Sequence, residues 1–126
     1  MKIYIATPVN ARREATLEEK RKAALRRVCE IAEKMKWHYP SAKFYSSFDY
    51  DITPLNIELT KKMYGCDMPS EPVIMGRCVQ RVMECDAIFM DWGYEHSKGC
   101  TVEHTTALTY GKKIIHAYDL SIEPEK

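Results

Sequence analysis

The fold is decided by residues 86–119, DAIFMDWGYEHSKGCTVEHTTALTYGKKIIHAYD. This segment opens with an apolar run, crosses a short polar loop into a stretch with helical character, and enters a second apolar run after Gly111. Continuous apolar runs are typical of strands that are buried on both faces, and a glycine commonly ends a helix. The segment therefore predicts a strand, a helix and a second strand, which is the repeating unit of parallel sheets covered by helices.

The same alternation extends over the whole chain. The expected strands are residues 2–8, 43–48, 86–92 and 113–119, and the expected helices are residues 17–36, 72–85 and 100–110. A short further helix is expected within residues 55–64, and residues 121–126 are expected to form a trailing tail. Strands that alternate with helices predict right-handed crossovers and a three-layer, doubly wound parallel sheet of four or five strands. The expected organisation is one α/β domain over residues 1–120.

The first expected helix carries a start signal and an apolar stripe. Thr16 followed by Glu19 forms a capping box. The apolar residues at helical spacing, which are expected to face the core, are Leu17, Ala24, Leu25, Val28, Ile31, Ala32 and Met35. Lysines and arginines are concentrated in residues 12–36 but are interleaved with acids, which indicates a solvated helix face.

Composition excludes several classes of protein. The chain has 126 residues, of which 45% are hydrophobic and 29% charged, as expected for one globular domain. Its net charge of +1 is not the excess of positive charge that is typical of proteins that bind a nucleic acid polymer or an anionic membrane. No run approaches the roughly 20 apolar residues of a membrane span, and the first residues are too polar for a signal peptide. The five cysteines form no C-x-x-C pair and no metal-binding spacing, which favours reduced thiols in the cytoplasm and predicts no metal site.

Loops at the carboxyl ends of the strands are the expected place for a ligand. In doubly wound sheets, ligands bind outside these ends, near the point where the strand order reverses. The corresponding residues are 7–13, 49–54 and 91–99. The third group leads directly into the helix that contains Glu103.

Glu103 has two interpretations. The amino terminus of a helix favours negative charge by roughly 0.3–1 kcal/mol, so a carboxylate there stays ionised, as a nucleophile requires. The same preference places ordinary surface acids at helix starts, and position alone favours this second interpretation. Ser97 and Gly99 can present a hydroxyl and backbone amides to a phosphate, or Ser97 can simply cap the helix. Tyr4 is either a core aromatic or a phenol that orients a carboxylate.

Two segments together resemble a known family. KIYIATPVNARRE (residues 2–14) and CDAIFMDWGYEHSKGCTVEHTTALTYGKKI (residues 85–114) are similar to the nucleoside 2-deoxyribosyltransferase-like superfamily, which includes the 2′-deoxynucleoside 5′-phosphate N-hydrolases. The resemblance covers about two-thirds of the chain and is poor over residues 48–72. It implies a Rossmann-like or flavodoxin-like fold, and cleavage or transfer of the N-glycosidic bond of a (deoxy)nucleoside 5′-monophosphate. It implies no cofactor and no metal, and a homodimer or larger homo-oligomer in which a neighbouring subunit completes the pocket.

The resemblance also implies roles for particular residues. Glu103 would be the nucleophile that attacks the anomeric carbon, and Tyr4 would hydrogen-bond and position its carboxylate. Ser97 matches a position that holds serine in the nucleotide hydrolases and an acid in the nucleoside transferases. A hydroxyl beside Lys98 and Gly99 would accept a 5′-phosphate, whereas an acid would repel it.

The chain departs from the family at the position of the proton donor. Active members carry an aspartate that helps to protonate the leaving base, and Cys78 stands there in this chain. A thiol is a poor substitute for a carboxylic acid. The candidate replacements are Asp91, Asp49 and Asp51.

The strand-one phosphate loop departs as well. Thr7 and Pro8 replace its glycine and serine, and Arg12 or Arg13 could compensate in binding the substrate. The competing interpretations are a non-catalytic nucleotide-binding module on the same fold and an assembly protein without a ligand. The assembly interpretation predicts that Tyr4, Ser97 and Glu103 do not converge on a pocket.

Overall fold

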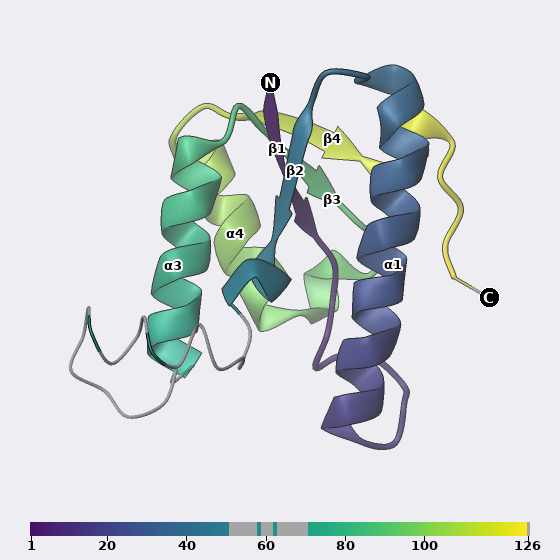
Figure 1. Ribbon diagram of the computed structural model, residues 1–126, viewed down its shortest axis with the longest axis vertical. Coiled ribbons are helices and arrows are strands. Elements are labelled where there is room, and N and C mark those ends of the chain that lie inside the picture. Colours follow the sequence, from purple (N-terminus) through teal and green to yellow (C-terminus); the bar gives the residue numbers. More distant parts are fainter. Residues whose placement is uncertain (51–57, 59–61, 63–70, 126) are drawn as a thin grey trace.

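Four parallel strands form a single sheet with helices on both of its faces (Figure 1). The computed structural model describes residues 1–50, 58, 62 and 71–125. The strands are β1 (Lys2–Ala6), β2 (Lys43–Ser46), β3 (Ala87–Met90) and β4 (Lys113–His116), in the order β2-β1-β3-β4. The helices are α1 (Leu17–His38), α3 (Glu71–Glu84) and α4 (Lys98–Thr109). The predicted α/β fold with a doubly wound parallel sheet is therefore confirmed, and the short helix expected within residues 55–64 falls largely outside the described residues.

The alternation of side chains along β1 divides the core into two halves. Ile3 and Ile5 pack on the α1 side, whereas Tyr4 and Ala6 pack on the side of α3 and α4. All four of these side chains are at most 1% exposed. This burial on both faces is what the continuous apolar run predicts, because each face of a parallel sheet is covered by helices.

The helix starts follow from side-chain caps. The Thr16 hydroxyl accepts a hydrogen bond from the amide of Glu19 at 3.1 Å, so α1 begins where the capping box predicts. The Ser97 hydroxyl accepts from the amide of Cys100 at 3.3 Å, which starts α4 at Lys98, two residues before the expected start. Gly111 ends the helix with a φ of +66°.

The expected apolar stripe on α1 is wrong at Leu17 and Leu25, and it omits Arg27, which is buried. Leu17 and Leu25 are 55% and 46% exposed, whereas Arg27 is 4% exposed. Arg27 is buried because its guanidinium is satisfied by the carboxylate of Asp91, which is 64 residues away in the sequence. A basic residue in a charged stretch thus occupies a core position that the apolar spacing alone did not assign to it.

All four strands end earlier than predicted, and after β2 and β4 a carboxylate turns the chain. The side chain of Asp49 accepts from the amide of Ser46 at 3.0 Å, and a 3₁₀ turn, η1 (Ser47–Tyr50), follows β2. The side chain of Asp119 accepts from the amide of His116 at 2.8 Å, where η3 (Ala117–Leu120) begins. β3 ends at Met90, two residues before its expected end.

The segment after η3 is packed against the domain, so the expectation of a trailing tail is wrong. Ile122 is 3% exposed and belongs to the core on the α1 side of the sheet. The indole Nε1 of Trp92 donates to the carbonyl oxygen of Ile122 at 2.8 Å. Figure 1 shows this segment running beside α1.

The strand order places the switch point of the sheet between β1 and β3. The chain passes from β1 through α1 to β2, on one side of this point, and from β3 through α4 to β4, on the other. The loops that follow β1 and β3 therefore diverge at their carboxyl ends, where ligands bind in folds of this kind.

Candidate functional site

A cavity of about 690 Å³ lies at the carboxyl ends of β1 and β3. Its walls come from the loop between β1 and α1, from η1, from α3 and from the first two turns of α4. The residues that line it and were predicted to form the site are Thr7, Ser97, Lys98, Gly99 and Glu103. Cavities of this size accommodate small molecules.

Glu103 belongs to α4 and lines this cavity. The side chain is buried, with 4% of the residue exposed, and its Oε2 accepts a hydrogen bond from the hydroxyl of Tyr4. Tyr4 is fully buried in the middle of β1, so its phenol is held by the sheet. The interpretation of Glu103 as a surface acid is therefore wrong, and Tyr4 is both a core aromatic and the partner of a carboxylate.

Burial controls the ionisation of this pair. Desolvation raises the pKa of Glu103 to about 7, and the hydrogen bond from Tyr4 opposes this rise. The pKa of Tyr4 lies well above its ordinary value, first because of burial and then because of the neighbouring Glu103. The helix terminus was expected to keep Glu103 ionised, but its contribution is small beside that of burial. Near neutral pH, Glu103 is therefore protonated in part of the molecules and a carboxylate in the rest.

Cys78 also lines the cavity, from α3. It is 2% exposed, and burial followed by the neighbouring Glu103 raises the pKa of its thiol to about 12. The thiol is therefore neutral and is a weak acid at physiological pH. The structure gives Cys78 no property that would make it an efficient donor of a proton.

Ser97 is the amino-terminal cap of α4, and it lines the cavity at the same time. In accepting from Cys100, its hydroxyl uses one lone pair, and the hydroxyl proton is not committed by that bond. Lys98 is exposed beside it. The two interpretations of Ser97, as a helix cap and as a hydroxyl that binds a ligand, are therefore compatible. The side chain caps α4 and also lines the cavity.

Thr7 is the lining residue with an unsatisfied polar group. It directly follows β1 and is 7% exposed, and its Oγ1 has no hydrogen-bond partner among the described residues. A buried hydroxyl without a partner costs about 1–3 kcal/mol, so it calls for an explanation. An oxygen or nitrogen atom of a ligand in the cavity would supply the missing partner.

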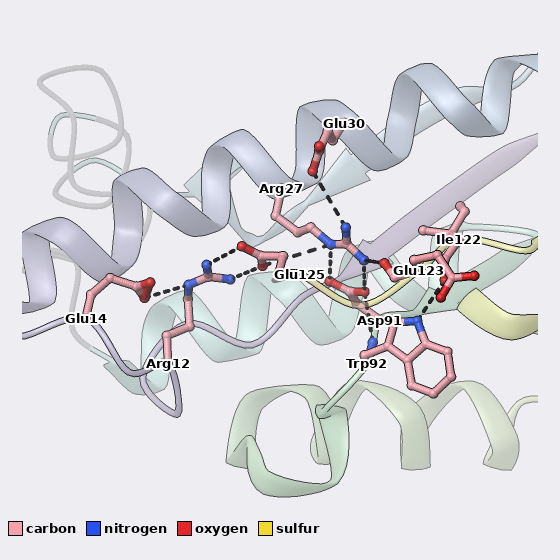
Figure 2. A network of polar contacts seen from close by, with 9 residues as sticks. All are labelled: Arg12, Glu14, Arg27, Glu30, Asp91, Trp92, Ile122, Glu123 and Glu125. Carbon is pink, nitrogen blue, oxygen red and sulfur yellow. Dashed lines mark hydrogen bonds and ion pairs between the residues drawn. The ribbon is translucent and has the colours of Figure 1, made fainter.

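Other predicted site residues lie elsewhere. Asp91, Pro8 and Arg12 line a second cavity of about 310 Å³ and do not line the cavity with Glu103. The carboxylate of Asp91 accepts two hydrogen bonds from Arg27, at 2.9 and 3.0 Å, and is 3% exposed (Figure 2). This bidentate pair ties the side chain of Asp91 into the framework of the domain, away from the cavity that Glu103 lines.

Asp49 and Arg12 likewise have partners within the protein. Asp49 is exposed and accepts from the amide of Ser46, which turns the chain after β2. The guanidinium of Arg12 pairs with Glu125 and Glu14. Asp51 lies outside the described residues.

The apolar side of the cavity was not predicted. Phe48 from η1 and Ile74 and Met75 from α3 line it, and Arg21 and His96 line the cavity as well. Residues 48–72 are the part of the chain where the family resemblance is poor, so no motif indicated Phe48. The signal that could have identified it is its place immediately after a strand, where loops tend to be functional.

The geometry bears on the interpretation as an assembly protein without a ligand. Ser97 and Glu103 line one cavity, and Tyr4 contacts Glu103 directly. An assembly protein without a ligand was expected to show no such convergence, and this expectation is wrong. In the described residues, no group of three or more His, Cys, Asp or Glu side chains is arranged to hold a metal ion, and no helix has the length and apolar character needed to cross a bilayer.

One family model matches part of the chain. The model of a family described as a domain of unknown function (DUF4406) matches residues 63–116, which is less than half of the chain. The match includes α3, β3 and α4, with Cys78 and Glu103, but not β1 with Tyr4. Neither the curated proteins nor the solved structures yielded a match.

Proposed function

We propose that the protein cleaves or transfers the N-glycosidic bond of a (deoxy)nucleoside 5′-monophosphate, with Glu103 as the nucleophile. The observation that carries this proposal is that buried Glu103, which accepts a hydrogen bond from Tyr4, lines a ligand-sized cavity. A carboxylate that is held by a phenol and lines a cavity is suited to attack an anomeric carbon. The family resemblance supports the same roles for the same two residues.

The reaction proceeds in two displacements. A carboxylate oxygen of Glu103 forms a bond to C1′ while the bond from C1′ to the base nitrogen breaks, and the base leaves with that electron pair and takes up a proton. Water, or the acceptor base in a transfer reaction, then attacks C1′ and loses a proton, and Glu103 is released as a carboxylate. Tyr4 holds the attacking oxygen in place throughout.

The polar side of the cavity supports a nucleotide over a free nucleoside. Ser97 and Gly99 lie at the amino terminus of the 12-residue helix α4, where backbone amides and the helix dipole favour an anion. Lys98 adds a positive charge. The apolar side, with Phe48 and Met75, is suited to the flat face of a base. A homodimer or larger homo-oligomer, which the resemblance implies, belongs to the same proposal.

The test is the release of free base. Purified protein is incubated with each deoxynucleoside 5′-monophosphate, and the products are separated by chromatography, with Glu103→Ala as the control. We expect at least one nucleotide to release its base with the wild-type protein only. Equal release by the variant would contradict the proposal.

A non-catalytic nucleotide-binding module is the second candidate, and Cys78 is the observation that favours it. With a pKa of about 12, this thiol stands where related enzymes carry an acid. A binding module would be stabilised against heat by nucleotides without forming any product. An enzyme, in contrast, would form product.

Activity is expected to depend on pH through Glu103. The nucleophile must be the carboxylate, and its pKa is raised to about 7. We therefore expect kcat/KM to fall about tenfold for each pH unit below about 7 and to level off above it. A profile that stays flat from pH 5 to pH 8 would show that a group other than Glu103 limits the reaction.

The unsatisfied hydroxyl of Thr7 provides a prediction about binding. Thr7→Val removes the hydroxyl at almost constant shape, so we expect equal or higher thermal stability but roughly fivefold weaker binding of the nucleotide. Thr7→Ser keeps the hydroxyl and is the matched control, with near wild-type affinity. Calorimetric titration and thermal unfolding of the three proteins measure both quantities. Unchanged affinity in Thr7→Val would mean that the hydroxyl does not contact the ligand.

A further inference from the structure

Residues 121–125 form a strap that is tied to three parts of the domain (Figure 2). The buried side chain of Ile122 anchors it in the core. The carbonyl oxygen of Glu123 accepts from Nη2 of Arg27 at 2.7 Å. The carboxylate of Glu125 accepts from both terminal nitrogens of Arg12, at 2.6 and 2.7 Å. The strap thus connects α1 and the end of β3 with the loop that follows β1.

The anchor of the strap is a connected set of hydrogen bonds. Arg27 is buried and donates to both oxygens of Asp91, and Asp91 in turn accepts from the backbone amide of Trp92 at 2.8 Å. The indole of Trp92 holds the carbonyl of Ile122. Hydrogen bonds thus connect Arg27, through Asp91 and Trp92, to the backbone of the strap at Ile122. From there the strap continues to Glu125, which contacts Arg12.

Arg12 lies in a loop that separates the two cavities. Its neighbours Thr7, Val9 and Asn10 line the cavity that contains Glu103, whereas Arg12 lines the second cavity together with Glu125. Ala11 lines both. The contact between Glu125 and Arg12 therefore holds the outer side of a loop whose inner side is a wall of the candidate active site.

We propose that Arg12 and Glu125 are positioning residues, which fix the wall formed by residues 7–11 in the shape that binds the substrate. Arg12 was expected to contact a phosphate, but two carboxylates already occupy its guanidinium. A bidentate pair between arginine and a carboxylate is among the more specific polar contacts, because both partners are planar and their geometry is fixed. The pair of Arg12 and Glu125 therefore affects substrate binding through the position of the loop and does not contact the substrate itself.

This inference rests on the proposed function, and its test separates the two. Glu125→Gln and Arg12→Gln each break the pair, whereas Glu30→Gln removes an exposed partner of Arg27, 3.6 Å away, without touching the loop. Hydrogen–deuterium exchange over residues 7–13 reports on the loop whether or not the protein turns over a nucleotide. KM and kcat for the active nucleotide report on the site.

Both disrupting variants are expected to exchange faster over residues 7–13 than the wild type and Glu30→Gln. They are also expected to raise KM roughly fivefold at unchanged kcat, and the double variant is expected to be no worse than either single one. Unchanged exchange in Glu125→Gln overturns the inference, and so does faster exchange with unchanged KM. If the wild-type protein neither binds nor turns over a nucleotide, the proposed function fails, and the exchange comparison still decides whether the strap fixes the loop.

Discussion

Glu103→Gln is expected to lose turnover almost completely while the protein remains folded and binds nucleotide. The substitution keeps the shape of the side chain but removes the nucleophilic oxygen. We expect kcat to fall by roughly 10⁴-fold or more, as it does when other enzymes lose their nucleophile. Steady-state kinetics with the nucleotide that the wild-type protein cleaves best measures the loss.

The same substitution is expected to stabilise the protein at alkaline pH. The pKa of Glu103 is raised from 4.5 to about 7, so the folded protein favours the neutral carboxyl group. The stability that this shift contributes is fully present below about pH 4.5 and is lost as the pH rises through about 7, and it amounts to about 3 kcal/mol. Glutamine stays neutral, so at pH 8 we expect Glu103→Gln to unfold at a higher urea concentration than the wild type.

The matched control is Glu95→Gln, an exposed acid in η2 (Tyr94–His96). This variant is expected to keep the kcat of the wild type. Its free energy of unfolding is expected to change by no more than about 0.5 kcal/mol. If Glu103→Gln kept its activity, Glu103 could not be the nucleophile. If Glu103→Gln were less stable than the wild type at pH 8, this would contradict a Glu103 side chain whose pKa is raised by burial.

Asp91→Ala is expected to cost the domain about 3–5 kcal/mol of unfolding free energy. Without Asp91, the guanidinium of Arg27 stays buried with the carbonyl of Glu123 and two more distant carboxylates as its remaining partners. Breaking one half of a buried ion pair is costly because the remaining charge has lost its compensation. Urea unfolding at pH 7, followed by circular dichroism, measures the loss.

Two further variants identify the cause. Glu30→Ala removes an exposed partner of the same arginine and is expected to change the free energy of unfolding by less than about 1 kcal/mol. The double variant Arg27→Met/Asp91→Leu removes both charges and is expected to recover most of the loss. If Asp91→Ala unfolded within 1 kcal/mol of the wild type, the pair would not hold the framework together.

The sheet could be predicted from the sequence because each strand is locally encoded. Ile3 to Ala6 and Ala87 to Met90 are apolar on both faces, and a sheet covered by helices requires this pattern. The start of α1 at Leu17 could be predicted from Thr16, because a capping side chain acts on its own helix. The early end of β2 could not, since it depends on how the carboxylate of Asp49 folds back onto the backbone.

The strap could not be predicted, because its contacts are distant in the sequence. Arg27 and Asp91 are 64 residues apart, and nothing in the charged stretch around Arg27 distinguishes it from the exposed cations beside it. The residues after η3 contain a single large apolar side chain, Ile122, and so have no periodic pattern. Tertiary contacts alone determine the position of this segment.

The site could be predicted in part. Tyr4 and Glu103 are 99 residues apart, and neither residue taken by itself indicated the other. The resemblance to the deoxyribosyltransferase-like superfamily paired them, and the strand order brings β1 and α4 together. The raised pKa of Glu103 could not be foreseen, because it follows from burial of the whole helix face.

The most direct test of the central claim is to detect the bond between Glu103 and the sugar. The wild-type protein is quenched with acid during turnover of its best nucleotide, digested, and analysed by mass spectrometry. We predict a deoxyribosyl phosphate adduct on the peptide that contains Glu103, and none in Glu103→Gln. Release of the base with an adduct on another residue, or with no adduct at any time before completion, would contradict the assignment of Glu103 as the nucleophile.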